Sequence, residues 1–126
     1  MFVKHFLPAI AWFILTLVLL CLPGSAIPKY PWLAVIHADK WIHIILFFTL
    51  CVLFSRIVYF KQAKTTAPKN WYIMIMLLGI VYGTLMEFVQ KNWVPNRSFE
   101  IADIAADSTG CLLAYIYVLG KFLKKG

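Results

Sequence analysis

Long apolar runs alternate with short polar segments along the chain, and each run is about as long as a membrane-spanning helix. Such a helix needs about 20 predominantly apolar residues. The pattern therefore predicts an all-α, polytopic integral membrane four-helix bundle, with residues 1–126 forming one transmembrane domain. The predicted spans are residues 6–22, 41–60, 71–89 and 101–119.

The segments between the runs are predicted to be loops. The first run, residues 6–22, follows Lys4 and precedes Pro-Gly-Ser-Ala, as the apolar part of a signal peptide does, but we interpret it as the first span. Residues 23–40 contain three prolines, which disfavour a regular helix, and a tyrosine and a tryptophan, which favour the membrane interface. Residues 61–69, with three lysines and a proline, are predicted to be a second loop.

The composition excludes both a soluble globular domain and a disordered chain. Hydrophobic residues make up 63% and charged residues 13% of the chain, and the mean hydropathy is +0.83. A soluble domain averages about 45–50% apolar and about 25% charged residues, and a disordered chain combines low hydrophobicity with high charge. The net charge of +7 fits the lysine and arginine excess of cytoplasmic loops. We expect membrane lipids as partners and no nucleic acid.

Basic and acidic residues separate to opposite ends of the predicted bundle. The loop between the first and second spans and the loop between the third and fourth spans, together with the adjoining helix ends, carry four basic residues and all five acidic residues. The termini and the loop between the second and third spans carry eight basic residues and no acidic one: Lys4, Arg56, Lys61, Lys64, Lys69, Lys121, Lys124 and Lys125. Because basic residues favour the cytoplasmic side, both termini are predicted to be cytoplasmic.

The acidic residues near the outer end are predicted to face the bundle interior. Glu87 follows Gly79 and Gly83 at intervals of four residues, so the three share one helix face. Such a glycine pair permits close helix packing, and it leaves a homo-oligomer open. In the fourth span, Asp103 and Asp107 share a face with small residues. A charged residue near mid-membrane costs about 2.5–3.5 kcal/mol on insertion scales, so these carboxylates need partners or a water-filled pocket.

These positions predict a polar pocket at the outer interface. His43 lies in an apolar run four residues after Asp39, and Arg97 lies on the loop before Asp103. Histidine and carboxylate groups serve as general acids or bases near neutral pH, and arginine binds phosphate or carboxylate. Such a pocket fits the polar head of a lipid or lipid-linked substrate. The predicted lining is Asp39, Lys40, His43, Glu87, Gln90, Arg97, Asp103 and Asp107.

Structural explanations compete with this interpretation. Arg97 could instead form an ion pair with Glu87 or Asp103 that only joins the third and fourth spans. The His43 ring could instead only donate a hydrogen bond to a nearby carbonyl oxygen. The spacing His-x-Asp-x-x-x-His from residue 37 matches no metal motif, so no metal site is predicted. No cofactor signature appears, and no cofactor is predicted. The three cysteines lie in apolar runs and are predicted to be buried.

The same residues resemble the VanZ-like family of small bacterial membrane proteins, named for low-level teicoplanin resistance. The matching stretches are DKWIHIILFFTL at 39–50, EFVQKNWVPNRSFEIAD at 87–103 and IAADSTG at 104–110. The usual asparagine is replaced by Asp107, which only accepts hydrogen bonds when ionised. The resemblance implies a multi-pass cell-envelope protein of the bacterial inner (cytoplasmic) membrane. The positions that fit the family pattern are Asp39, Lys40, His43, Glu87, Gln90, Arg97, Asp103 and Gly110.

Three functions remain open from the sequence. The first is a hydrolase or transferase acting on a lipid headgroup, a lipid-linked cell-wall intermediate or a lipoprotein. A second is non-catalytic binding or transport of a lipid or glycopeptide antibiotic, and a third is a structural role. In the first, Glu87 is the general acid or base, His43 its partner, Arg97 the anion stabiliser and Asp103 the orienting group. The predicted substrate-binding residues are Asp39, Lys40, Gln90 and Asp107.

Overall fold

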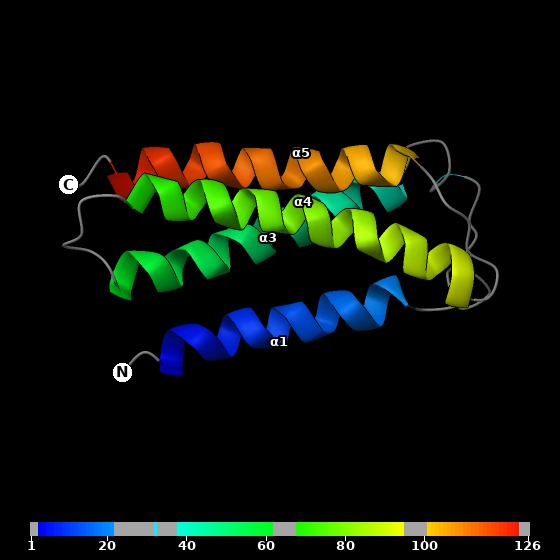
Figure 1. Cartoon of the computed structure of the whole chain (residues 1–126), viewed down its shortest axis with the longest axis horizontal. Coiled ribbons are helices and arrows are strands. Elements are labelled where there is room, and N and C mark those ends of the chain that lie inside the picture. The colour runs from blue at the N-terminus through cyan, green and yellow to red at the C-terminus, as the bar shows by residue number, and fades with distance from the viewer. Residues whose placement is uncertain (1–2, 22–31, 33–37, 62–67, 95–100, 124–126) are drawn as a thin grey trace.

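A computed structural model describes residues 3–21, 32, 38–61, 68–94 and 101–123. Every regular element among these residues is a helix, which confirms the all-α prediction for this part of the chain. The helices lie side by side along one long axis (Figure 1). They are α1 (Val3–Leu20), α3 (Ala38–Lys61), α4 (Pro68–Trp93) and α5 (Ile101–Val118), followed by a π-helical turn, η2 (Leu119–Leu123).

Three helices are long and apolar enough to cross a membrane. Their apolar parts are Lys40–Tyr59, Asn70–Trp93 and Ile101–Lys121, which correspond to the second, third and fourth predicted spans. The apolar part of the first helix, Phe6–Leu20, is shorter than those of the other three. With 18 residues, α1 is about 27 Å long at 1.5 Å per residue. That is slightly less than the roughly 30 Å of a typical hydrocarbon core.

Three segments between the predicted spans are shorter than expected because the helices extend into them. Helix α3 begins at Ala38, so Asp39 and Lys40 are helical, and α4 begins at Pro68. A proline is well tolerated at the first helical position, where its missing N–H would have no intrahelical partner. At its other end α4 continues to Trp93, four residues beyond the predicted limit of 89. All four predicted helices are present among the described residues and in the predicted order, but the boundaries of α3 and α4 were set too short.

Glycines bring α3, α4 and α5 into close contact. A Cβ atom at Gly110 would lie 2.5 Å from the Ile44 carbonyl oxygen and 3.0 Å from the Phe48 nitrogen, so α5 touches the backbone of α3. A Cβ at Gly79 would lie 2.7 Å from Cys111 Sγ, so α4 packs at this glycine against a side chain of α5. The packing faces expected from the small residues are confirmed.

The helices enclose a small apolar core, while much of the outer surface is also apolar. The core is formed by Leu20, Leu46, Phe47, Leu50, Cys51, Met86, Cys111 and Ala114. Cys51 and Cys111 are buried free thiols, as predicted. Cys21 is exposed, contrary to the prediction, because it follows the last residue of α1. Large exposed side chains such as Leu7, Leu78 and Ile116 suit a surface that faces lipid.

Side-chain hydrogen bonds attach α1 to its neighbours. Trp12 Nε1 donates to the Leu46 carbonyl oxygen of α3 at 3.0 Å. Thr16 Oγ1 donates to the Phe13 carbonyl oxygen at 2.7 Å and lies 2.8 Å from the Tyr82 hydroxyl of α4. Because a threonine hydroxyl has one hydrogen to donate, Tyr82 donates to Thr16. These hydrogen bonds help to keep α1 against α3 and α4. They matter within lipid because burial of apolar side chains there gives little driving force for helix association.

Candidate functional site

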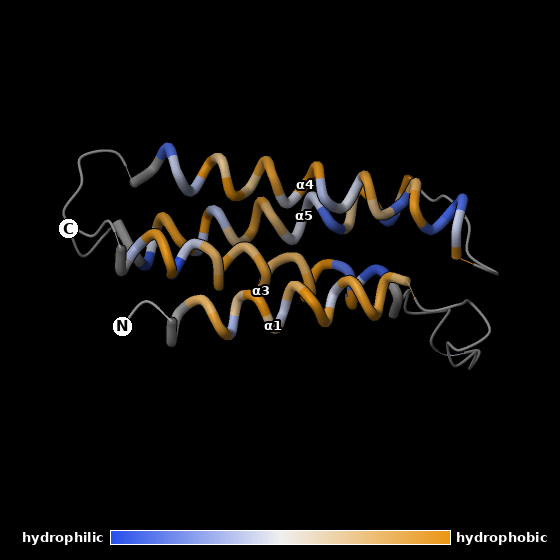
Figure 2. The backbone as a smooth tube through the Cα atoms, turned by 60° about the horizontal axis from the view of Figure 1, so that its bottom comes forward, coloured by the Kyte–Doolittle hydropathy of each residue, from blue (hydrophilic) through white to orange (hydrophobic). Residues whose placement is uncertain are grey.

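Most of the buried polar side chains among the described residues gather at one end of the bundle, although Thr16 and Ser55 do not belong to this group. Helices α3 and α5 begin at this end and α1 and α4 end there, whereas α1 begins and α5 ends at the opposite end (Figure 1). Figure 2 shows hydrophilic positions on the helices near this end, between longer hydrophobic stretches. We call the group the polar cluster. Its members are Lys40, His43, Glu87, Gln90, Asp103 and Asp107, and all but Lys40 are buried.

The polar cluster lies a short distance inside the helix ends. His43 is five residues after the first residue of α3, and Asp107 is six residues after the first residue of α5. Glu87 precedes the last residue of α4 by six. At 1.5 Å per residue, these three side chains are attached about 8–9 Å inside their helices. This depth suits a group that meets the polar end of a lipid rather than its chains.

A short ion pair joins α3 to α5 at the rim of the polar cluster. Lys40 Nζ lies 2.6 Å from Asp103 Oδ1, within charge-assisted hydrogen-bond distance. The Lys40 side chain remains 20% exposed, while the Asp103 side chain is 7% exposed. Lys40 therefore provides a positive charge that is partly open to the interface and is held by a buried carboxylate.

A second contact between the same helices lies deeper and involves a histidine. His43 Nδ1 lies 2.7 Å from Asp107 Oδ1, and both side chains are buried. Because an ionised carboxylate only accepts, Nδ1 carries the hydrogen and donates it to Asp107. His43 Nε2 lies 3.9 Å from Asp103 Oδ2. The ring is thus held by Asp107 and directs its second nitrogen towards the Lys40–Asp103 pair.

Gly83 leaves the space that the Asp107 carboxylate occupies. A Cβ atom at position 83 would lie 2.6 Å from Asp107 Oδ2 and 2.9 Å from Asp107 Cβ. Sequence analysis gave this glycine a packing role only. The structure adds a second role, since any side chain at Gly83 would press on the carboxylate that holds His43.

Glu87 and Gln90 complete the polar cluster from α4. Each is 1% exposed, and Glu87 is within electrostatic range of His43. Gln90 Nε2 donates to the Leu20 carbonyl oxygen at 2.8 Å, where α1 ends. Helix ends leave carbonyl oxygens without intrahelical partners. The Gln90 amide therefore binds the end of α1, a role that sequence analysis missed, and its substrate-binding role stays a prediction.

The structure brings together four of the eight predicted site residues in direct contact and places two more beside them. Sequence analysis did not identify the specific pairs Lys40–Asp103 and His43–Asp107, although the helical spacing placed each residue on an inward face. Arg97 lies outside the described residues, and so does the side chain of Asp39. Their predicted contributions to the pocket stay predictions.

Within the part of the chain that the structure describes, no group of three or more histidine, cysteine, aspartate or glutamate side chains is arranged to hold a metal ion. The carboxylates of Asp103 and Asp107 instead pair with Lys40 and His43. The chemistry available to the polar cluster is therefore that of an oriented imidazole, a cation and buried carboxylates.

No family model, no curated protein and no solved structure matches the chain. The resemblance to the VanZ-like family therefore stays a prediction from the sequence. Because folds of this simplicity serve many functions, a function must be argued from the polar cluster itself.

Proposed function

We propose that the protein is a VanZ-like hydrolase or transferase of the bacterial inner membrane. Its substrate is a lipid headgroup, a lipid-linked cell-wall intermediate or a lipoprotein at the extracytoplasmic interface. The observation that carries the proposal is the buried His43–Asp107 pair next to the Lys40–Asp103 pair. Ionisable residues are expensive within a membrane, and those present usually serve a function.

The geometry suits proton transfer by His43. Asp107 fixes the ring through Nδ1, which leaves Nε2 as the atom that exchanges protons. Nε2 takes a proton from an attacking water or alcohol and returns it to the leaving oxygen. An aspartate that orients a histidine in this way also stabilises the imidazolium that forms. We assign Glu87 a second acid–base role, and we assign substrate binding to Asp39, Lys40 and Gln90.

Lys40 supplies the charge that a lipid headgroup requires. Its ammonium group is partly exposed at the rim, where a phosphate or carboxylate can approach it without being fully buried. Arg97, in the segment of the sequence between α4 and α5, is proposed as a second anion-binding group. A headgroup held by these cations would lie over His43, with its acyl chains directed towards the middle of the membrane.

We propose four spans with both termini in the cytoplasm. Supporting this orientation, α1 begins and α5 ends at the same end of the bundle (Figure 1), and the basic residues concentrate in the segments near that end. A green fluorescent protein fused after Gly126 should therefore fluoresce, whereas alkaline phosphatase at the same place should be inactive. Active alkaline phosphatase on the C-terminus would reverse the orientation and put the polar cluster on the cytoplasmic side.

Mass spectrometry of envelope lipids and lipoproteins tests the function in cells. A deletion strain should lose one species or accumulate its precursor, and Glu87→Gln at matched protein level should reproduce that change. Asn92→Ala provides the control, because Asn92 is exposed on the same helix and its amide donates to the Phe88 carbonyl oxygen one turn earlier. Identical profiles in the deletion and wild-type strains would argue against any lipid or lipoprotein substrate.

Binding without chemistry is the second candidate. Every buried side-chain nitrogen or oxygen in the described part of the chain already has a hydrogen-bond partner. Such complete pairing is typical of a preformed binding or structural site. A module that binds a lipid or a glycopeptide antibiotic would lose affinity in Lys40→Ala, yet no lipid would change its mass in the presence of the wild-type protein.

A further inference from the structure

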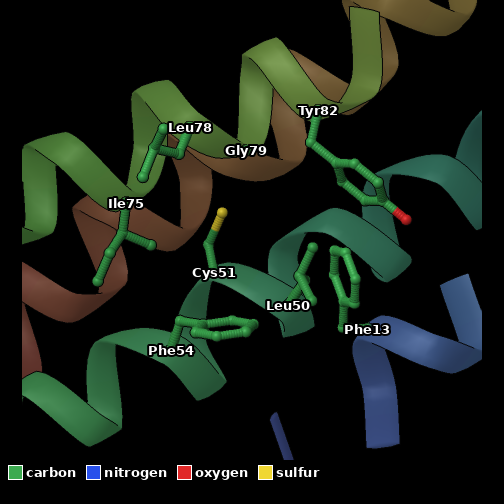
Figure 3. Close-up of a pocket in the computed structure, with 8 residues that line it drawn as sticks. All are labelled: Phe13, Leu50, Cys51, Phe54, Ile75, Leu78, Gly79 and Tyr82. Carbon is green, nitrogen blue, oxygen red and sulfur yellow. The ribbon is translucent and has the colours of Figure 1, made fainter. Parts of the chain in front are cut away.

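An apolar cavity lies between α1, α3 and α4, deeper in the bundle than the polar cluster. Its volume is about 200 Å³, and its walls include Phe13 of α1, Cys51 and Phe54 of α3, and Leu78 and Gly79 of α4. Figure 3 shows these side chains around the opening, with the Cys51 sulfur near Gly79. A Cβ atom at Gly79 would lie 2.9 Å from Cys51 Sγ, so the glycine lets α4 lie close to α3 at this wall of the cavity.

The cavity and the polar cluster lie on the same helices. Cys51 follows His43 by eight residues on α3, and Gly79 precedes Glu87 by eight residues on α4. On each helix the cavity is therefore about 12 Å farther from the cluster end, at 1.5 Å per residue. Tyr82 lies between the two regions on α4, with its ring centroid 5.1 Å from that of Phe13. A chain attached to a headgroup at the cluster would reach this depth.

The size and depth of the cavity indicate which kind of molecule can bind in it. About 12 Å deeper than the polar cluster, a bilayer offers acyl chains and other helices. A helix is about 10–12 Å across with its side chains, which is too wide to enter a space of this volume. The Tyr82 hydroxyl is already bonded to Thr16, so the lining offers little to a polar ligand. An unfilled space would forfeit dispersion contacts along its walls.

We propose that this cavity holds one acyl chain of the lipid whose headgroup binds at the polar cluster. The inference rests on the proposed function in one respect, that a lipid headgroup binds at the cluster. It extends that function by naming the substrate class as a lipid with a long acyl chain. The chain runs from the cluster past Tyr82 to Cys51 and Phe54.

Two tryptophan variants on α4 test the cavity. Leu78 lines the cavity and is 60% exposed, so Leu78→Trp adds bulk there without entering the core. Leu77 is the adjacent residue, is 52% exposed and is not part of the lining, so Leu77→Trp adds the same bulk on the lipid-facing surface. Because both variants change an exposed leucine to tryptophan, they should fold equally well.

The full-length protein is reconstituted in vesicles of phosphatidylglycerol and phosphatidylethanolamine. One probe is a phosphatidylglycerol with a diazirine near the middle of an acyl chain, and the other is an alkane with the same diazirine and no headgroup. After illumination, crosslinked residues are mapped by mass spectrometry. We expect the phosphatidylglycerol probe to label Cys51 and Phe54, Leu78→Trp to lose most of this labelling, and Leu77→Trp to retain it.

Three results would overturn the inference. The first is no enrichment of labelling at Cys51 and Phe54, and the second is equal labelling in Leu78→Trp and Leu77→Trp. The third is equal labelling of the cavity by the alkane, which would show that any hydrocarbon chain fills it and that the headgroup is not involved. The vesicle experiment also separates the two proposals. If a lipid changes its mass but the cavity is not labelled, only the acyl-chain proposal fails. If the cavity is labelled in a headgroup-dependent way but no lipid changes its mass, only the catalytic step is wrong.

Discussion

Gly110→Ala is expected to destabilise the helix bundle by about 1–3 kcal/mol, the usual range for an overpacked core. The added methyl group would meet the Ile44 carbonyl oxygen at 2.5 Å and the Phe48 nitrogen at 3.0 Å. Both atoms belong to the backbone of α3, so no side chain can turn aside, and α5 must move away from α3. The Lys40–Asp103 and His43–Asp107 pairs join these same two helices, so they should weaken together with the packing.

Thermal unfolding of the purified protein in detergent measures this effect, and Gly120→Ala is its matched control. A Cβ atom at Gly120 meets nothing within 4 Å. Replacing a helical glycine with alanine usually gains up to about 1 kcal/mol in helix propensity, so the control should be as stable as the wild type or slightly more so. A Gly110→Ala protein that unfolds at the same temperature as Gly120→Ala would contradict the close contact between α3 and α5.

His43→Gln is expected to lower lipid turnover by roughly 10²–10⁴-fold, the typical contribution of a general acid or base. Glutamine can fill the space and form hydrogen bonds, but it cannot transfer a proton near neutral pH. The melting temperature should change far less than the rate. Turnover is followed by mass spectrometry of lipids in vesicles that contain the purified protein. A variant with unchanged turnover would remove His43 from the mechanism.

Asp107→Asn separates the hydrogen bond from the charge at the same position. The amide oxygen of asparagine can still accept from His43 Nδ1, which lies 2.7 Å from Asp107 Oδ1. The asparagine amide carries no charge to stabilise the imidazolium, so we expect turnover to fall more than tenfold, equivalent to more than about 1.4 kcal/mol of activation free energy. Turnover within tenfold of the wild type would show that Asp107 contributes its hydrogen bond and not its charge.

Helical periodicity was enough to predict which polar residues face the interior. Glu87 shares a face with Gly79 and Gly83, and Asp103 shares one with Asp107; all five are buried. This works because residues four apart on a helix lie one above the other, whatever the helix packs against. The lengths of the apolar runs likewise identified three helices that are long and apolar enough to cross a membrane.

Pairing between helices could not be predicted in the same way. Whether His43 meets Asp103, Asp107 or Glu87 depends on the relative height and rotation of three helices, which no local pattern determines. The contact between Gly110 and the α3 backbone helps to set this register, and it aligns Lys40 with Asp103 and His43 with Asp107. The Thr16–Tyr82 hydrogen bond also went unpredicted, although a threonine within an apolar run was the available signal.

The α4 glycines link packing to chemistry. Gly79 keeps α4 close to Cys51 and Cys111, and Gly83, one turn nearer the polar cluster, leaves room for the Asp107 carboxylate. Small residues that let helices approach in a membrane are usually explained by packing alone. Here the same approach brings a buried carboxylate into the position that orients His43.

The central claim is that the polar cluster performs chemistry on a lipid, and the most direct test is lipid turnover by the purified protein. Wild-type protein in vesicles of bacterial envelope lipids should convert one lipid into a product of different mass, at a rate proportional to the amount of protein. Vesicles with His43→Gln should show almost none of this product. If wild-type and His43→Gln vesicles both keep every lipid unchanged, the cluster is a binding or structural site and the catalytic account is wrong.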